Sequence, residues 1–308
     1  MKSYLILVLC LVSYVSFSQG QRFIENEVSI SKWIDGTLLS PIGIQKQALA
    51  IIIAGSGPTN RNGNQNFLKN NSLKKLAEGL SNSGIATFRY DKRIVKQIRK
   101  GNVDKNIMFD DFVTDASDVI DYFKAKEVYS KIYVIGHSQG SLVGMLSAKD
   151  RSDGFISLAG AGQNIGDVLV EQAAQMDPKL GKETQPIVEQ LKQGKTVTDY
   201  PSALASVFSA DIQPFMIAWM TYNPTEIIKE LEMPILIING TKDLQVSESE
   251  AKLLKEANEK ATLIIIENMN HVLFEIKGDD LENSKSYNES FRPISPKLVS
   301  SIIKFIGS

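Results

Sequence analysis

From residue 47 onward, short runs of apolar residues alternate with stretches whose apolar positions repeat at helical spacing. An apolar run of about four to eight residues bounded by turn residues fits a strand buried on both faces. The alternation is typical of parallel strands joined by crossover helices. We therefore predict an α/β chain with core strands at residues 48–54, 85–90, 131–135, 154–158, 234–238 and 261–266, and helices at 72–81, 109–123, 141–148, 248–257 and about 295–306.

The clearest of these helices covers residues 109–123, where the apolar side chains fall on one stripe. Aspartates occupy its other positions. Because helical spacing points them away from the stripe, we predict a charged outer face rather than a metal site. The stripe comprises Phe109, Phe112, Val113, Ala116, Val119, Ile120 and Phe123, and the aspartates are Asp110, Asp111, Asp115, Asp118 and Asp121.

Two segments depart from the alternation. Between residues 162 and about 231 the pattern is helical with no intervening buried strand, and the stretch is too long for a simple crossover. We predict an inserted helical cap there. Residues 27–33 and 36–39 alternate ahead of the first core strand, which predicts an antiparallel hairpin at the sheet edge.

The N-terminus has its own pattern. Lys2 precedes an apolar run at residues 4–15, and small residues follow at 16–18, which predicts a signal peptide over 1–18 and an exported, periplasmic or extracellular protein. The run is shorter than the roughly 20 residues of a spanning helix, although a retained anchor stays an alternative. A lipoprotein site at Cys10 is disfavoured because Leu9 precedes it. Cys10 is the only cysteine, so the mature chain would hold no thiol.

The composition and charge of the chain limit the kinds of molecule that it is expected to bind. The 308 residues carry a formal net charge of -1, with 43% hydrophobic and 22% charged residues, as in an ordinary globular protein. Lysines and glutamates are interspersed, so no basic stripe could neutralise a row of phosphates. Nucleic acid is therefore excluded as an expected partner, and the charge balance indicates neither the substrate nor the oligomeric state.

Residues 136–140 match the G-x-S-x-G nucleophile motif, with Ser138 at the centre. The pentapeptide is common by chance, but a strand is predicted immediately before it and a helix immediately after it. Flanking glycines permit a turn sharp enough for the Ser138 hydroxyl to project from the strand end. We predict that Ser138 is a nucleophile, the structural alternative being a helix N-cap between turn glycines.

A serine hydroxyl needs a base within hydrogen-bond reach. The chain has only two histidines. His137 adjoins Ser138 on a turn where neighbouring side chains diverge, whereas His271 follows the apolar strand 261–266. We therefore predict His271 as the base.

The base in turn needs a carboxylate to orient it. Asp243 follows the strand 234–238 and gives the chain order Ser, Asp, His that the motif expects. Glu267 is its main competitor.

An oxyanion formed during attack on a carbonyl needs backbone N–H donors arranged in advance. We predict one donor at Gln139, directly after the nucleophile, and one at Ser56, in the Gly-Ser-Gly loop after the first core strand. A phosphate loop is disfavoured because no Gly-Lys-Ser/Thr follows. From the aromatic and sulfur-containing side chains of the cap we predict that Phe215, Trp219 and Met220 line a substrate pocket, although helical spacing also fits a core role.

Several motifs in order give the chain a family resemblance. They are residues 53–64 around Gly55-Ser56-Gly57, residues 88–93 (Phe-Arg-Tyr-Asp-Lys-Arg), the Ser138 motif, residues 239–246 around Asp243, and Asn270-His271. With these the sequence resembles the bacterial α/β-hydrolases grouped with serine aminopeptidase-like and esterase D-like proteins. The resemblance covers nearly all of the mature chain.

The resemblance implies an α/β-hydrolase fold, in which a mostly parallel central sheet is flanked by helices, here with the inserted cap. It implies carboxylesterase activity, and it carries the triad onto Ser138, Asp243 and His271. We expect small or medium acyl esters as substrates. No metal or organic cofactor is expected. The alternatives are an amidase or aminopeptidase that uses the same triad, and a binding module that keeps the fold without turnover.

Overall fold

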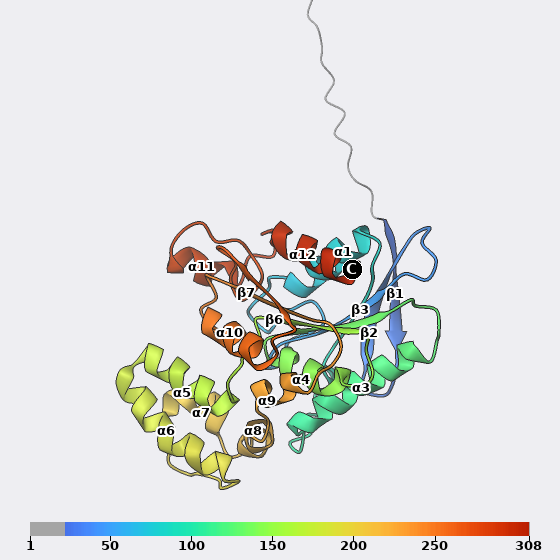
Figure 1. The fold of residues 1–308 in the computed structure, drawn as a ribbon. Helices are drawn as coiled ribbons and strands as arrows, with labels where there is room; N and C mark the ends of the chain where they lie inside the picture. The colour runs from blue at the N-terminus through green and yellow to red at the C-terminus, as the bar shows by residue number, and fades with distance from the viewer. Residues whose placement is uncertain (1–21, 308) are drawn as a thin grey trace, which may run out of the picture.

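The computed structural model describes residues 22–307, so the predicted signal peptide and Cys10 lie outside the described residues. Eight strands form one sheet in the order β1-β2-β4-β3-β5-β6-β7-β8 (Figure 1). The strands are β1 Phe23–Ser29, β2 Asp35–Pro41, β3 Leu49–Ile53, β4 Ala86–Tyr90, β5 Ile132–His137, β6 Gly154–Leu158, β7 Ile235–Gly240 and β8 Thr262–Ile266.

The sheet is antiparallel at one edge and parallel elsewhere. β1 pairs with β2, and β2 pairs with β4, both antiparallel. From β4 to β8 every neighbouring pair is parallel. The predicted mostly parallel α/β sheet is therefore confirmed, and the predicted hairpin is present with shifted ends. Because parallel strands finish at the same edge, the residues that follow β3, β5, β7 and β8 meet at one side of the sheet.

Helices cover both faces of this sheet (Figure 1). One face carries α1 and α12, and the other carries α3, α4 and α10, with α2 and α11 in loops that the sequence pattern did not predict as helices. The bounds are α1 Ser72–Asn82, α2 Arg93–Arg99, α3 Phe109–Lys124, α4 Gln139–Ala148, α10 Glu248–Ala257, α11 Asp280–Ser286 and α12 Pro296–Ile306.

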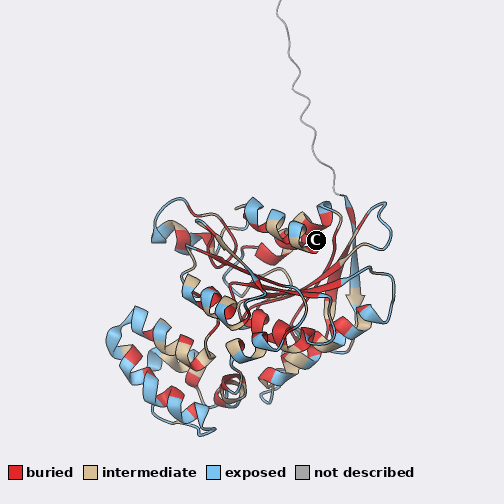
Figure 2. Cartoon of the chain, in the orientation of Figure 1, coloured by how far each residue is buried: buried red, intermediate tan, exposed pale blue. Residues whose placement is uncertain are grey.

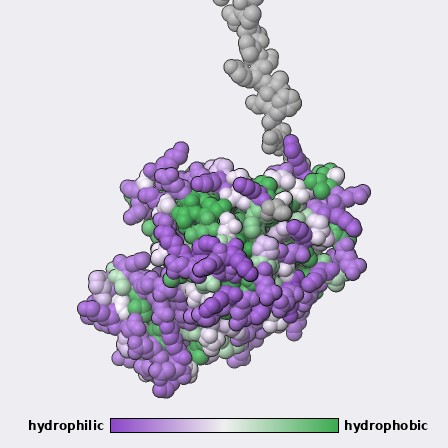
Figure 3. Space-filling model, viewed as in Figure 1, coloured by the Kyte–Doolittle hydropathy of each residue, from purple (hydrophilic) through white to green (hydrophobic). Residues whose placement is uncertain are grey.

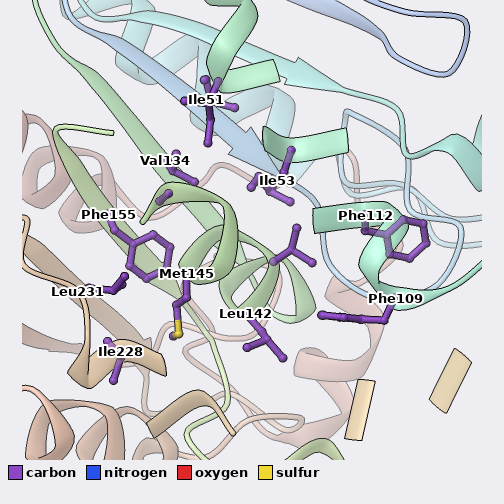
Figure 4. Packing of buried hydrophobic residues seen from close by; sticks show 14 of the residues in the cluster. Ile51, Ile53, Phe109, Phe112, Val134, Leu142, Met145, Phe155, Ile228 and Leu231 are labelled. Carbon is purple, nitrogen blue, oxygen red and sulfur yellow. The ribbon is translucent and has the colours of Figure 1, made fainter. Parts of the chain in front are cut away.

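The central strands are apolar on both faces because each face has its own core. In β3, Ile51 and Ile53 belong to the core under α3 and α4, part of which is shown in Figure 4. Ala50 and Ile52 belong to the core under α1 and α12. The strands consequently lie in the most buried layer of the molecule (Figure 2). This double burial explains why they are continuous apolar runs in the sequence.

Further helices lie between β6 and β7. They are α5 Ile165–Met176, α6 Pro178–Lys192, the 3-10 helix η1 Ser202–Leu204, α7 Ala205–Phe208, α8 Gln213–Met220 and α9 Pro224–Lys229. We call this stretch the helical insertion. Its entry is held by the buried Glu250 carboxylate of α10, which accepts hydrogen bonds from the backbone N–H groups of Gly162 and Gln163 at 2.8 and 2.9 Å.

The predicted outward direction of the α3 aspartates is wrong for Asp115. Its side chain is buried and paired with Arg93, whose Nε and Nη2 donate over 2.8 Å each. The loop that contains Arg93 was not predicted as helical, so no partner for a buried Asp115 was evident from the sequence. A buried carboxylate is tolerated here because the guanidinium neutralises it with two hydrogen bonds.

The outer surface is mostly hydrophilic in the view of Figure 3, with apolar residues gathered in separate patches. Within residues 22–307, no single helix is long and apolar enough to cross a bilayer. One pair bent by 68°, Ser202–Phe208 with Gln213–Lys229, meets the length and composition criteria together.

Candidate active site

Ser138 lies on a strained turn between β5 and α4. Its φ and ψ angles are 55° and -123°, in a region that residues with a side chain rarely adopt. The turn is held by two backbone hydrogen bonds, from Ser138 N to Leu158 O at 2.9 Å and from Ser141 N to Ser138 O at 2.8 Å. The side chain makes no capping bond to α4. The hydroxyl is therefore presented at the strand end and is not used to cap the helix.

The two glycines of the motif are required by close backbone contacts. A Cβ at Gly136 would lie 2.2 Å from the carbonyl oxygen of Gly140. One at Gly140 would lie 2.4 Å from the carbonyl oxygen of Ile53, at the end of β3. Neither contact can be relieved by rotating a side chain. The G-x-S-x-G pattern thus encodes the packing of the first turn of α4 against β3 and β5.

Asp243 and His271 are brought together, although 28 residues separate them in the chain. His271 Nδ1 donates to the Asp243 carboxylate, with distances of 3.1 Å to Oδ1 and 2.9 Å to Oδ2, and both side chains are buried. The same carboxylate accepts the backbone N–H groups of Gln245 and Val246 at 2.8 and 2.9 Å. Because Nδ1 carries the proton, Nε2 of His271 is left as an acceptor. The competitor Glu267 is exposed on the surface.

The loop that carries His271 is fixed by a buried amide. Asn270 accepts the backbone N–H of Phe274 at 3.0 Å and donates to Asn283 at 2.9 Å and to Ser286 at 2.8 Å. These bonds join the loop after β8 to α11. They hold His271 at the edge of the sheet where Ser138 projects.

Ser138 and His271 line the same pocket, but no hydrogen bond joins their side chains in the described chain. In unliganded enzymes such bonds are often long and form only when substrate is bound. The structure therefore places the candidate nucleophile and the candidate base at one wall without a hydrogen bond between their side chains.

His137 packs against His271 and makes a hydrogen bond to its backbone. Its Nε2 donates to the carbonyl oxygen of His271 at 2.8 Å, and the two rings lie 4.9 Å apart. Burial, together with the nearby His271, lowers the pKa of His137 to about 4. His137 is therefore neutral at neutral pH and accepts a proton only weakly, and its Nε2 is already engaged by the His271 carbonyl.

The loop after β3 lies directly against Ser138. A Cβ on Gly55 would meet Cβ of Ser138 at 3.1 Å. The carbonyl oxygen of Ser56 is held within the loop, because Thr59 Oγ1 and Gln65 Nε2 donate to it over 2.7 and 3.1 Å. The backbone N–H groups of Ser56 and Gln139 donate to no other described residue. Both predicted donors are thus free beside Ser138.

Lys92 is a buried contact of this loop that the sequence did not reveal. Its Nζ donates to the carbonyl oxygen of Gly55 at 2.5 Å and lies 3.4 Å from Oε1 of Gln139. The ammonium is also 5.2 Å from the centre of the Phe112 ring. Burial lowers the pKa of Lys92 to about 7. One side chain therefore contacts Gln139 and the carbonyl of the Gly55–Ser56 peptide group, and the two free N–H groups belong to Gln139 and to this peptide group.

An apolar cavity of about 200 Å³ opens from Ser138 toward the helical insertion. Ser56 and Gln139 lie on its wall as well, so the free N–H donors face the same space. It is walled largely by apolar side chains of α4 and the insertion, among them Leu142, Ile165, Val168, Val207, Met216 and Trp219.

The predicted pocket residues are only partly correct. Trp219 lines the cavity, together with Met216 three positions earlier on α8. Phe215 does not; it packs edge-on against Phe112, with ring centres 5.6 Å apart. Met220 is buried and is likewise absent from the cavity wall. One face of α8 lines the cavity and the adjoining face packs on α3. The sequence pattern alone does not show which face of α8 points to the cavity.

Comparison with known proteins identifies the family of the chain. Residues 70–276, more than half of the chain, match the family described as serine aminopeptidase, S33. The chain belongs to that family. This S33 family member is also 25% identical over 268 residues to Esterase EstD of Thermotoga maritima, an alignment that covers 84% of the chain and 62% of the relative. The chain thus spans about three fifths of that relative's length.

Solved structures share the fold of this S33 family member. Est1E from Butyrivibrio proteoclasticus superposes with a TM-score of 0.58 at 17% identity, over 92% of this chain and 99% of that one. The α/β-hydrolase GrgF from Penicillium sp. sh18 gives a TM-score of 0.56 at 15% identity, over 92% and 97%. The predicted α/β-hydrolase fold is confirmed.

Proposed function

We propose that this chain is a serine carboxylesterase that works through an acyl-enzyme on Ser138. The observation that carries the proposal is the convergence of a strained serine, a histidine oriented by a buried aspartate and two free backbone N–H groups at one wall. Four separate loops, after β3, β5, β7 and β8, supply these groups, and their combination matches the needs of acyl transfer. The esterase named among the relatives supports the same reaction.

In the proposed reaction, Ser138 Oγ attacks the ester carbonyl carbon while its proton passes to Nε2 of His271. Asp243 holds the opposite ring nitrogen and stabilises the imidazolium that forms. The N–H groups of Ser56 and Gln139 bind the developing oxyanion. His271 then returns the proton to the leaving alcohol, and water hydrolyses the acyl-enzyme by the same steps.

The apolar cavity fits the acyl chain. A group the size of a water molecule occupies on the order of 10–15 Å³ of cavity volume. The cavity volume of about 200 Å³ therefore holds a short or medium acyl chain. No aspartate, glutamate, lysine or arginine is among the described wall residues of this cavity to pair with an acyl group that carries charge. We therefore propose esters of small or medium apolar acids as substrates.

Aminopeptidase action is disfavoured despite the family's descriptive name. Binding a free α-amino group requires an acceptor of negative charge near the scissile bond. Among the described residues that line either cavity at Ser138, none is an aspartate or a glutamate. The same triad could still cleave amides, so a comparison of p-nitrophenyl acetate with aminoacyl p-nitroanilides separates the activities.

The test is the hydrolysis of p-nitrophenyl acetate by purified protein and by Ser138→Ala. We expect turnover in the parent and a loss of at least about a thousandfold in kcat in the variant. A folded parent protein without turnover, or a variant that retains it, would refute the proposal.

A further inference from the structure

Two cavities of different chemistry meet at Ser138. Ser56, Ser138 and Gln245 belong to the walls of both. The first is the apolar cavity under the helical insertion. The second we call the alcohol cavity; its polar wall residues include Thr59, Gln65, Asn70, Ser72, Gln245 and Tyr287.

The position of His271 indicates which part of an ester enters the alcohol cavity. His271 lines this cavity but not the apolar one. In the proposed reaction its Nε2 protonates the departing alkoxide as the acyl C–O bond breaks, so the leaving alcohol must lie on the side of His271. The acyl chain then occupies the apolar cavity, and the alcohol portion occupies the polar one.

Three polar groups on the wall of the alcohol cavity have no hydrogen-bond partner of ordinary geometry in the described chain, and one of them, the Tyr287 hydroxyl, is fully buried. The hydroxyl of Tyr287 is buried without a hydrogen bond of ordinary geometry, although Gln245 lies nearby. Ser72 is 2% exposed, and its hydroxyl bonds to no described residue. His137 donates a hydrogen bond from Nε2 to the carbonyl oxygen of His271. Its Nδ1 is therefore an acceptor without a partner in the described chain.

Such groups are costly to bury unless a ligand or water completes their hydrogen bonds. Between them they offer hydroxyl donors and one nitrogen acceptor. Burial raises the pKa of Tyr287, so its phenol keeps its proton and remains a donor. This combination of donor and acceptor is what the hydroxyl group of a ligand pairs with.

The alcohol cavity also carries no fixed charge of its own. No lysine, arginine, aspartate or glutamate is among its wall residues, and its histidines are the base and the neutral His137. A leaving alcohol with an ammonium or a carboxylate would find no counter-ion there. Its volume of about 70 Å³ corresponds to roughly five water-sized groups, the size of a short alcohol.

We infer that the alcohol cavity selects esters of short, uncharged alcohols that carry further hydroxyl groups. This inference rests on the proposed esterase function and narrows it to a substrate class. The apolar cavity then sets the acyl chain, and the unpaired groups at Tyr287, Ser72 and His137 bind the extra hydroxyls of the alcohol.

The test compares 2,3-dihydroxypropyl butanoate with propyl butanoate, which share the acyl group and the carbon chain of the alcohol. Their kcat/KM values are measured by pH-stat titration of the acid released. We expect the dihydroxypropyl ester to be favoured by about tenfold, since a hydrogen bond between neutral groups changes binding by roughly two- to tenfold. Butanoylcholine and the butanoyl ester of lactate have charged alcohol portions. Their kcat/KM values should both be lower than that of the dihydroxypropyl ester.

Variants connect the preference to the cavity. Tyr287→Phe and Ser72→Ala should each lower the dihydroxypropyl-to-propyl ratio by about three- to tenfold. Tyr129→Phe is the matched control, because Tyr129 is a partly buried tyrosine packed on Phe123 outside the alcohol cavity. It should leave the ratio unchanged. Reporting a ratio removes any effect of a variant on folding or on the amount of active protein.

The outcomes separate the inference from the function beneath it. If both neutral esters are hydrolysed with equal kcat/KM and neither variant changes their ratio, the inference is wrong and the esterase proposal stands. If the charged esters are the better substrates, the inference is also wrong. If the folded parent hydrolyses none of these esters, the esterase proposal itself fails.

Discussion

Lys92 donates a hydrogen bond from Nζ to the carbonyl oxygen of Gly55 over 2.5 Å. That carbonyl and the N–H of Ser56 belong to the same planar peptide group and point in opposite directions. By holding the carbonyl on the buried side, Lys92 turns the Ser56 N–H toward the space beside Ser138. Lys92 thereby positions one of the two proposed oxyanion donors, although it lines neither cavity at Ser138.

Lys92→Met removes this contact while keeping much of the apolar stem. We expect kcat for p-nitrophenyl butanoate to fall by about tenfold to a hundredfold with little change in KM, because the lost alignment matters most when the oxyanion forms. Steady-state kinetics on protein that retains the parent's circular dichroism spectrum provides the measurement. The exposed Lys149→Met is the control, and an unchanged kcat in Lys92→Met would contradict the positioning role.

Asp243→Asn and Glu267→Gln test which acid orients His271. The amide at residue 243 cannot stabilise the imidazolium and favours the wrong tautomer, so kcat should fall by about a thousandfold or more. Glu267 is exposed, and its neutral variant should stay within about twofold of the parent. Equal effects of the two substitutions on kcat would remove Asp243 from the mechanism.

The pH dependence of stability should depend on His137. Its pKa is about 4 in the folded chain against 6.5 for an unperturbed histidine, so the unfolded chain binds more protons between these values. Stability is therefore lost as the pH falls from about 6.5 toward 4, by at most about 1.4 kcal/mol per pH unit for one proton.

His137→Gln keeps an N–H donor for the carbonyl of His271 but does not titrate. Urea unfolding at pH 7 and pH 4.5 should show a smaller loss of stability in this variant than in the parent. If the free energy of unfolding falls by the same amount in both proteins between pH 7 and pH 4.5, the inference that His137 is buried in its neutral form is wrong.

Gly136→Ala tests the steric origin of the nucleophile motif. The new methyl group would lie 2.2 Å from the carbonyl oxygen of Gly140, so the first turn of α4 must move. We expect a loss of about 1–3 kcal/mol in stability, together with lower kcat, measured by urea unfolding and ester hydrolysis. Parent-like values for both would show that the turn accommodates a side chain.

The sequence was sufficient to place the candidate catalytic residues at the ends of buried strands. Ser138, Asp243 and His271 each come after a buried strand, and parallel strands bring such positions to one edge. The apolar runs predicted the core strands within one or two residues because two-sided burial leaves a continuous signal in the sequence. Asp243 could be preferred over Glu267 from its place in the chain order before any contact was known.

The rest depended on packing between distant segments. Lys92 follows β4 at the same edge of the sheet and lies in the 88–93 motif, and both signals could have suggested it, but its contact with Gly55 arises only from the fold. Tyr287 reaches the alcohol cavity from the loop after α11. The errors at Phe215 and Met220 have the same origin, since an apolar helix gives its composition but not which face meets a cavity.

The central claim is that Ser138 is an activated nucleophile, and covalent labelling tests it most directly. The folded protein is treated with a fluorophosphonate, digested and mapped by mass spectrometry while the remaining p-nitrophenyl acetate hydrolysis is followed. We predict one adduct, on the peptide that contains Ser138, with activity lost in proportion to labelling. Absence of an adduct on the folded, active enzyme, or full labelling at Ser138 with activity retained, would contradict the account.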